Sequence, residues 1–294
     1  MNQLKRILAA TDLSTPARHA VERAALVSKD TSASLDLLHV ANLALFERLR
    51  NLISSTPVDI DQHLLETAKH RLSDLGNNLK QRFDISVDTH LVVGSLLPEL
   101  TKITKDLASD LLVCGSKGDS VVRHLTLGTT ALRMLGKATY PVLVVKQPCN
   151  KSYQRILLPV DFSHFSERAI SLARTIAPNA GLVLVNVYEV PFEGQLRYAN
   201  VDEDTINHYR TIAKQEANKN MDDLCERAGL NIYETNTVVV HGNPIARILE
   251  QQESWDCDLI VIGKHGRNML EEMFLGSVTK HVLSESPGDV LVSI

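Results

Sequence analysis

The chain has 294 residues, of which 44% are hydrophobic and 22% are charged, and its formal net charge is −4 at pH 7. This length accommodates one large domain or two of ordinary size, each with enough apolar residues to bury a core. The acidic balance argues against a general nucleic-acid binder, and no apolar run approaches the ~18 residues of a membrane-spanning helix.

Strand and helix patterns alternate along the first half of the chain. Apolar runs predict strands at 6–12, 34–40, 85–94, 110–115 and 141–146. Helices are expected after a cap at Ser14, and over 59–82, 96–108 and 127–136. Because the strands are nearly continuous runs of Val, Ile and Leu, we expect a mainly parallel sheet with helices on both faces.

The second half repeats this order. Strands are predicted at 155–161, 182–187, 236–242, 258–263 and 288–294, with helices over 166–177, 202–228 and 244–252. Self-similarity at a fixed period marks repeated structural units. The sequence therefore predicts two α/β domains, 1–147 and 154–294, each an open five-stranded, Rossmann-like sheet.

Cysteine and histidine spacings predict no metal site. The four cysteines, Cys114, Cys149, Cys225 and Cys257, form no CxxC pair, which favours reduced thiols. The eleven histidines are scattered without metal-ligand spacing. The opening segment MNQLKRILAATD shows no signal-peptide pattern, so a cytoplasmic location is expected.

A glycine pattern, G-x2-G-x9-G-[ST], occurs once in each half. It covers residues 115–129 and 263–277, an offset of 148 residues (263 − 115). Each copy follows a predicted strand and ends where a new helix starts, so backbone N–H groups could bind an anion there. Glycine at such positions lets the backbone approach a ligand and permits φ > 0.

Ligands of open α/β sheets bind beyond the carboxyl ends of the strands. A carboxylate after the first strand could accept hydrogen bonds from ribose, the end of the second strand could contact a base, and the glycine loop could hold phosphates. The candidate residues are Thr11, Asp12, Val40, Gly115, Lys117, Gly118, Gly128, Thr129 and Thr130 in the first half, and Val160, Asp161, Val187, Ile262, Gly263, His265, Gly266, Gly276, Ser277, Val278 and Thr279 in the second.

Purely structural roles for these candidate residues are also compatible with the sequence. The glycines could simply turn the chain between strand and helix, and Asp12 and Asp161 could be helix caps. Lys117 and His265 could be solvated residues of a loop.

The duplicated glycine pattern, the Asp after the first strand and the closing PVLVV segment (141–145) resemble the universal stress protein family in its tandem form. The resemblance covers essentially the whole chain. It implies the adenine nucleotide alpha-hydrolase-like fold and, in the ATP-binding branch, an Asp on ribose, the second strand on adenine and the glycine motif on phosphates. A further hydroxyl follows the motif in that branch: Thr279 fits it, whereas Ala131 stands at the matching place in the first half.

The resemblance implies a stress-response protein that binds ATP, ADP or AMP, with or without Mg²⁺, and acts by binding rather than by turnover. A slow ATPase or phosphotransferase is one alternative, although there is no Walker-type GxxxxGK[ST] and no evident general base. A nucleotide-free scaffold that recruits partners through 41–58 and 188–203 is another. The two halves are expected to pack as a pseudo-dimer through their apolar last strands, and a homodimer of chains is a further option.

Overall fold

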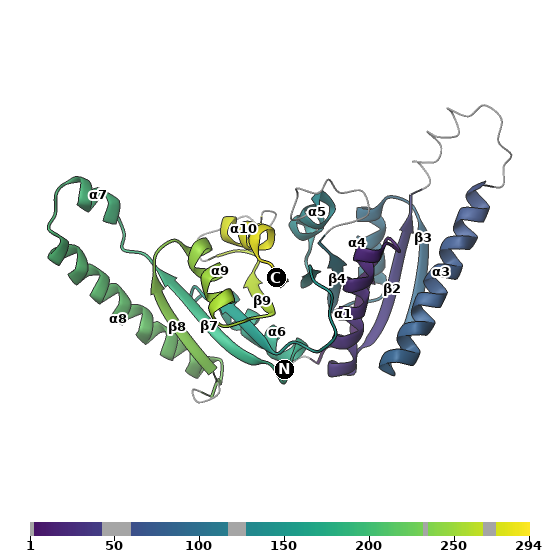
Figure 1. Cartoon of the computed structure of the whole chain (residues 1–294), viewed down its shortest axis with the longest axis horizontal. Helices are drawn as coiled ribbons and strands as arrows, with labels where there is room; N and C mark the ends of the chain where they lie inside the picture. The colour runs from purple at the N-terminus through teal and green to yellow at the C-terminus, as the bar shows by residue number, and fades with distance from the viewer. Residues whose placement is uncertain (1–2, 43–59, 117–127, 232–234, 267–274) are drawn as a thin grey trace, which may run out of the picture. The chain divides into compact units, whose positions relative to one another are not determined.

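The computed structural model describes residues 3–42, 60–116, 128–231, 235–266 and 275–294 (Figure 1). The chain divides into two compact units, residues 1–152 and 153–294, called here the first and the second unit. The predicted pseudo-dimeric packing of the two halves stays a prediction. Lys117, Gly118 and nearly all of the predicted loop 41–58 lie outside the described residues.

The first unit is built around a five-stranded sheet. Its strands lie in the order β3-β2-β1-β4-β5, and every neighbouring pair in it is parallel. The strands are β1 (Arg6–Ala10), β2 (Ser34–Ala41), β3 (Val87–Val93), β4 (Leu111–Gly115) and β5 (Val142–Val145). The helices between them are α1 (Thr15–Thr31), α3 (Ile60–Phe83), α4 (Leu96–Asp106) and α5 (Thr129–Lys137).

Helices cover both faces of this sheet. A Cβ on Gly76 of α3 would meet the side chains of Thr89 and Leu37, so α3 lies on the face to which these two residues point. Arg6 points to the opposite face and donates from Nη1 to the carbonyl of Leu107, directly after α4 (3.1 Å). Because side chains alternate along a strand, α3 and α4 therefore lie on opposite faces.

The second unit repeats this architecture. Its strands follow the order β8-β7-β6-β9-β10, again with every neighbouring pair parallel. They are β6 (Arg155–Pro159), β7 (Gly181–Tyr188), β8 (Thr235–His241), β9 (Leu259–Gly263) and β10 (Asp289–Ser293). The helices are α6 (His164–Ile176), α7 (Glu193–Tyr198), α8 (Glu203–Arg227), α9 (Pro244–Ser254) and α10 (Ser277–Glu285).

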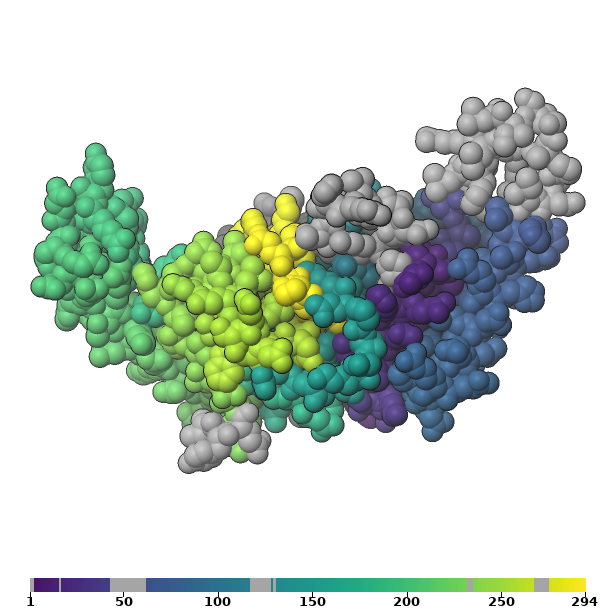
Figure 2. All heavy atoms as spheres, viewed as in Figure 1, coloured from purple at the N-terminus to yellow at the C-terminus, as the bar shows by residue number. Residues whose placement is uncertain are grey.

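The predicted fold class is confirmed in both units. The sheets are parallel because the strands are buried on both faces and joined by crossover helices, and the central strands β1, β4, β6 and β9 are almost wholly buried. Among the described residues one helix was not predicted, α7, which stands out with the start of α8 from the rest of the second unit (Figure 2).

The order of strands places a topological switch point in each unit. In the second unit, the chain leaves β6 toward β7 on one side and later returns to β9 on the other side, so the connections after β6 and β9 diverge. In a doubly wound sheet the crevice at this point is where ligands bind.

The four cysteines are buried thiols. Burial raises the pKa of Cys114 and Cys257 to about 12, so neither is a thiolate near neutral pH. Within the described ranges, no helix is long and apolar enough to cross a membrane, and no group of three or more His, Cys, Asp or Glu side chains could hold a metal ion. The predicted cytoplasmic location stays a prediction.

Candidate functional site

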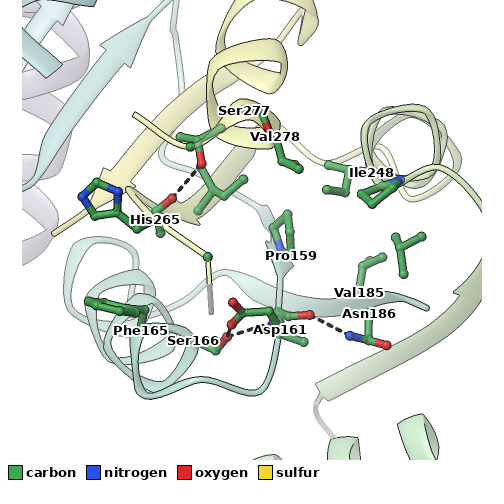
Figure 3. Close-up of a pocket in the computed structure, with 18 residues that line it drawn as sticks. Pro159, Asp161, Phe165, Ser166, Val185, Asn186, Ile248, His265, Ser277 and Val278 are labelled. Carbon is green, nitrogen blue, oxygen red and sulfur yellow. Dashed lines mark hydrogen bonds between the residues drawn. The ribbon is translucent and has the colours of Figure 1, made fainter. Parts of the chain in front are cut away.

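A pocket of about 350 Å³ opens at the switch point of the second unit (Figure 3). Its size lies within the range of about 300–1,000 Å³ that is usual for small-molecule sites. Every candidate residue of the second half lines it, from Val160 and Asp161 after β6 to Thr279 at the start of α10. The structure therefore brings together residues that lie far apart in the sequence.

Asp161 is held in place through one of its carboxylate oxygens. Oδ1 accepts hydrogen bonds from the Ser163 N–H (3.1 Å), the Ser163 hydroxyl (2.5 Å) and the Ser166 hydroxyl (2.8 Å). Oδ2 faces the glycine loop, since a Cβ on Gly266 would lie 3.6 Å from it. Asp161 is not the N-cap of α6, which is Ser163, so Oδ1 fixes the turn before the helix instead. The role of Asp161 in ligand binding stays a prediction.

The turn that carries Asp161 is fixed to the neighbouring strand. Val160 donates from its N–H to the carbonyl of Val185 (2.9 Å) and accepts from the Asn186 side-chain amide at its own carbonyl (2.9 Å). Phe162 then adopts a left-handed conformation, with φ of 62°. Val187, which was predicted to contact a base, follows Asn186 directly, so the same stretch of β7 both holds the turn and lines the pocket.

The glycine loop approaches its own backbone closely. A Cβ on Gly263 would stand 3.1 Å from the carbonyl oxygen of His265, and one on Gly276 would stand 3.3 Å from that of Lys264. These contacts are tighter than ordinary van der Waals distances. Gly276 also donates from its N–H to the Lys264 carbonyl (2.9 Å), which closes the loop.

The expectation that these glycines need φ > 0 is wrong for Gly263, Gly266 and Gly276. Gly276 has φ of −56°. The left-handed position of the site is instead Phe162. Glycine is favoured at Gly263 and Gly276 because the loop packs closely against its own backbone, whereas the predicted close approach to a ligand stays a prediction.

The start of α10 faces the pocket and can offer backbone donors. Lys280 is the first residue whose N–H bonds within the helix, to the carbonyl of Gly276 (2.9 Å). The N–H groups before it, on Ser277, Val278 and Thr279, belong to the first turn, where an α-helix supplies no acceptor of its own. Such a turn favours a negatively charged group.

Thr279 has a structural contact as well as a place in the pocket wall. Its buried hydroxyl donates to the carbonyl of Gly263 (2.8 Å) and so ties α10 to the end of β9. The hydroxyl proton is therefore committed to the protein, and a ligand phosphate would have to meet the N–H groups or the exposed Ser277.

The rest of the wall is mainly apolar and was missed by sequence reasoning. Phe165 lies on the same side as His265, and Ile248 of α9 lies across the pocket beside Val185 (Figure 3). Residues lining the pocket that were not among the candidates are Pro159, Phe165, Ser166, Val185, Asn186, Pro244 and Ile248. The spacing Asp161-x-Ser163 is that of an Asx turn, which forms here, but it does not identify Ser166.

The first unit places its candidates in the same positions of the fold. Thr11 and Asp12 follow β1, and Asp12 Oδ1 accepts from the Ser14 N–H (3.0 Å). His39 Nδ1 lies 2.8 Å from the Thr11 carbonyl, where Asn186 acts in the second unit; since a carbonyl only accepts, Nδ1 carries the proton.

The remaining first-unit candidates border the same edge of its sheet. Val40 lies near the end of β2, Gly115 ends β4, and Gly128 donates from its N–H to the Ser116 carbonyl (2.8 Å) before α5 begins at Thr129 and Thr130. The glycine loop between Ser116 and Gly128 lies outside the described residues.

Fold and pocket together define a class of protein. Each unit is a doubly wound parallel α/β sheet, and the second unit has a small-molecule pocket at its switch point. This is the architecture of the adenine nucleotide alpha-hydrolase-like fold.

Comparison with known proteins agrees with this class. The sequence model of the universal stress protein family matches residues 3–146 and 152–293. A universal stress protein of Mycolicibacterium smegmatis is 26% identical over 298 residues, covering 97% of this chain and 96% of that protein. Universal stress protein MT2052 of Mycobacterium tuberculosis is 26% identical over 205 residues, which cover 68% of this chain but only 63% of its own length.

A solved structure has the same fold over nearly the whole chain. The universal stress protein from Archaeoglobus fulgidus superposes with a TM-score of 0.71 and 21% identity, covering 99% of both chains. This chain therefore belongs to the universal stress protein family, with two family domains in tandem.

Proposed function

We propose that the second unit binds an adenine nucleotide, ATP, ADP or AMP, and that the protein acts in the stress response through this binding. The observation that carries the proposal is the pocket at the switch point, where one carboxylate, an apolar wall and a helix start converge. The family to which the chain belongs supports the same proposal.

Each part of the pocket suits one part of a nucleotide. Asp161 presents Oδ2 toward the glycine loop, where it would accept hydrogen bonds from ribose hydroxyls. Val185, Val187 and Ile248 form apolar surface for a base, and the backbone of β7 at Val187 would contact its edge. The N–H groups at the start of α10 would hold phosphates.

The lack of a side chain at Gly266 supports the proposed position of the phosphates. Gly266 adds no side chain between Asp161 and the start of α10, which leaves the space for a ligand. When Mg²⁺ accompanies the nucleotide, we expect phosphate oxygens and water to supply most of its ligands, as is usual for Mg²⁺.

Slow hydrolysis or phosphate transfer is the alternative from the enzyme class. It requires a general base beside the phosphates. Among the described residues that line the pocket the one carboxylate is Asp161, whose Oδ1 is engaged by Ser163 and Ser166. We therefore propose binding as the function.

The first experiment is to denature the purified protein, identify any released nucleotide by mass spectrometry, and then titrate the protein with ATP by calorimetry. The matched variants are Gly266→Ala and Gly194→Ala. Among the described residues, an added Cβ at Gly266 meets Asp161 Oδ2 at 3.6 Å, an ordinary contact, but would fill ligand space; at Gly194 of α7 it meets none of them within 4 Å.

We expect wild type and Gly194→Ala to bind ATP alike and Gly266→Ala to bind it at least about tenfold more weakly, with unfolding midpoints unchanged. Absence of any released nucleotide together with absence of ATP binding, with and without Mg²⁺, overturns the proposal. ATP turnover that Gly266→Ala abolishes would favour the enzyme alternative.

A further inference from the structure

Ser166 is the buried partner of Asp161 that no sequence motif assigned to the site. Its side chain is 4% exposed and lies in the first turn of α6. Its hydroxyl donates to Asp161 Oδ1 (2.8 Å) and accepts from the Asp161 N–H (3.1 Å). A single hydroxyl thus fixes both the backbone and the side chain of Asp161 (Figure 3).

The contact selects one orientation of the carboxylate. Ser163 and Ser166 bind the same oxygen, Oδ1, so Oδ2 is directed toward Gly266 and the pocket. A carboxylate held this way loses little rotational freedom when a ligand arrives, and preorganisation of this kind raises affinity.

The first unit lacks this arrangement. Asp12 follows β1 as Asp161 follows β6, but the residue five positions later is Ala17 instead of Ser166. Ala17 is as buried as Ser166, at 5%, so the two units differ there by one hydroxyl in a similar environment. Asp12 itself is exposed, whereas Asp161 is half-buried.

A second buried hydroxyl is present in the second unit and missing at the matching position of the first. Thr279 ties α10 to the carbonyl of Gly263, and its counterpart in the first unit is Ala131, also 3% exposed. At these two positions the first unit has alanine where the second unit has a hydroxyl that forms a hydrogen bond at the carboxyl edge of the sheet.

We propose that Ser166 is a positioning residue that aims Asp161 Oδ2 at the ribose of a bound nucleotide, and that the second unit is therefore the tighter of the two sites. This rests on the proposed nucleotide binding. Ser166 acts through Asp161 and is not itself a ligand, so its effect depends on the ribose hydroxyls.

The test is a thermodynamic cycle on the full chain by calorimetry, with Ser166→Ala and two ligands, ATP and 2′,3′-dideoxy-ATP. We expect Ser166→Ala to weaken ATP binding about tenfold, the size of one hydrogen bond from a ribose hydroxyl to the Asp161 carboxylate, and to leave dideoxy-ATP binding within about twofold. Ser171→Ala, the same change on the exposed side of α6, is the control and should alter neither ligand.

Retained dideoxy-ATP binding shows that the variant pocket is folded. The inference is overturned if Ser166→Ala leaves ATP binding unchanged, if it weakens both ligands equally, or if wild type binds the two ligands with equal affinity. If wild type binds neither ligand, the proposed function fails instead, which separates the two outcomes.

Discussion

At the scale of residues, corresponding positions of the two units can be compared within one chain. Asp36 on β2 is 2% exposed, with His90 Nε2 2.6 Å from Oδ1 and Arg6 Nε 3.4 Å from Oδ2. In register, Asp36 pairs with Leu8 and His90 with Leu38; the matching pairs of the second unit are Val183 with Leu157 and Val238 with Val185. In the second unit, two valines thus occupy the positions of Asp36 and His90.

This difference predicts the outcome of exchanging the pair. His90→Val should destabilise the protein by about 2 kcal/mol, because it leaves a buried carboxylate with one partner; the figure is below that of a fully buried pair, since the His90 side chain is 28% exposed. Asp36→Val combined with His90→Val should recover stability to within about 1 kcal/mol of wild type. Arg6 would keep its bond to the Leu107 carbonyl, as Arg155 keeps one to the Trp255 carbonyl beside the valines.

Urea denaturation of the wild type, the single variant and the double variant checks this prediction. A double variant as unstable as His90→Val alone would show that the two units do not tolerate the same packing at this place.

The sequence predicts several residues of the site, but not the hydrogen bonds that orient them. The positions of Asp161, Gly263, Gly266 and Gly276 at one sheet edge could be predicted, because strand ends and glycine spacing are visible in the sequence. Two hydrogen bonds of the site depend on how closely β6, β7 and α6 approach one another. They run from Ser166 to Asp161 Oδ1 and from Asn186 to the Val160 carbonyl. No pattern along the chain encodes that approach.

At the scale of elements, most strands and helices followed from hydrophobic periodicity, and α7 did not. It has six residues, none of them buried, too few to show a helical period. It is held by side chains that come from later in the sequence: Glu193 contacts Arg210 of α8 through Oε1, and its Oε2 lies 2.8 Å from His241 Nε2 at the end of β8. Such distant partners explain why a sequence window could not predict the helix.

The Glu193 contacts make α7 sensitive to acid. The hydrogen bond from Arg210 is the main cause that lowers the pKa of Glu193 in the folded protein, with the charges of Arg210 and His241 adding to it. A carboxyl whose folded pKa is lowered stabilises the fold above its unfolded pKa, and this contribution is lost as pH falls through the folded value. We therefore expect α7 to lose protection below about pH 4, where an ordinary Glu protonates.

Hydrogen exchange of residues 192–199, corrected for the intrinsic rate at each pH, measures this effect. The same acid range also protonates Asp202, whose pKa is lowered mainly by the backbone N–H of Thr205 at the start of α8. Glu193→Gln separates the two groups: it should reduce protection of α7 already at pH 6 and remove most of its dependence on acid. An unchanged acid step in Glu193→Gln would assign the effect to Asp202.

At the scale of the whole molecule, the repeat has kept its architecture while its edges have diverged. Both units have the same strand order and parallel register, so the duplicated strands carry the fold. Besides the Asp36–His90 pair, differences lie at the carboxyl edge of the sheet, in Ser166 against Ala17, Thr279 against Ala131 and Asn186 against His39. Because Ser166 and Thr279 are alanines in the first unit, we expect a division between a tighter-binding second unit and a supporting first unit.

This division predicts that nucleotide acts unequally on the two units. A ligand that binds only the folded second unit at about 100 times its Kd adds about 2.7 kcal/mol to that unit's stability, which slows exchange through opening of the unit about a hundredfold. We expect this protection around 160–166, 262–266 and 275–279, the segments that line the pocket, with little change at 11–17 and 128–137 in the first unit.

Hydrogen exchange with mass spectrometry at one ATP concentration measures both units in the same sample. Because the two units are each compact in themselves, binding in one need not stabilise the other. Equal protection of 128–137 would mean that the first unit binds nucleotide as tightly or is coupled to the second. Gly266→Ala decides between these, since blocking the second pocket removes coupled protection but leaves binding by the first unit intact.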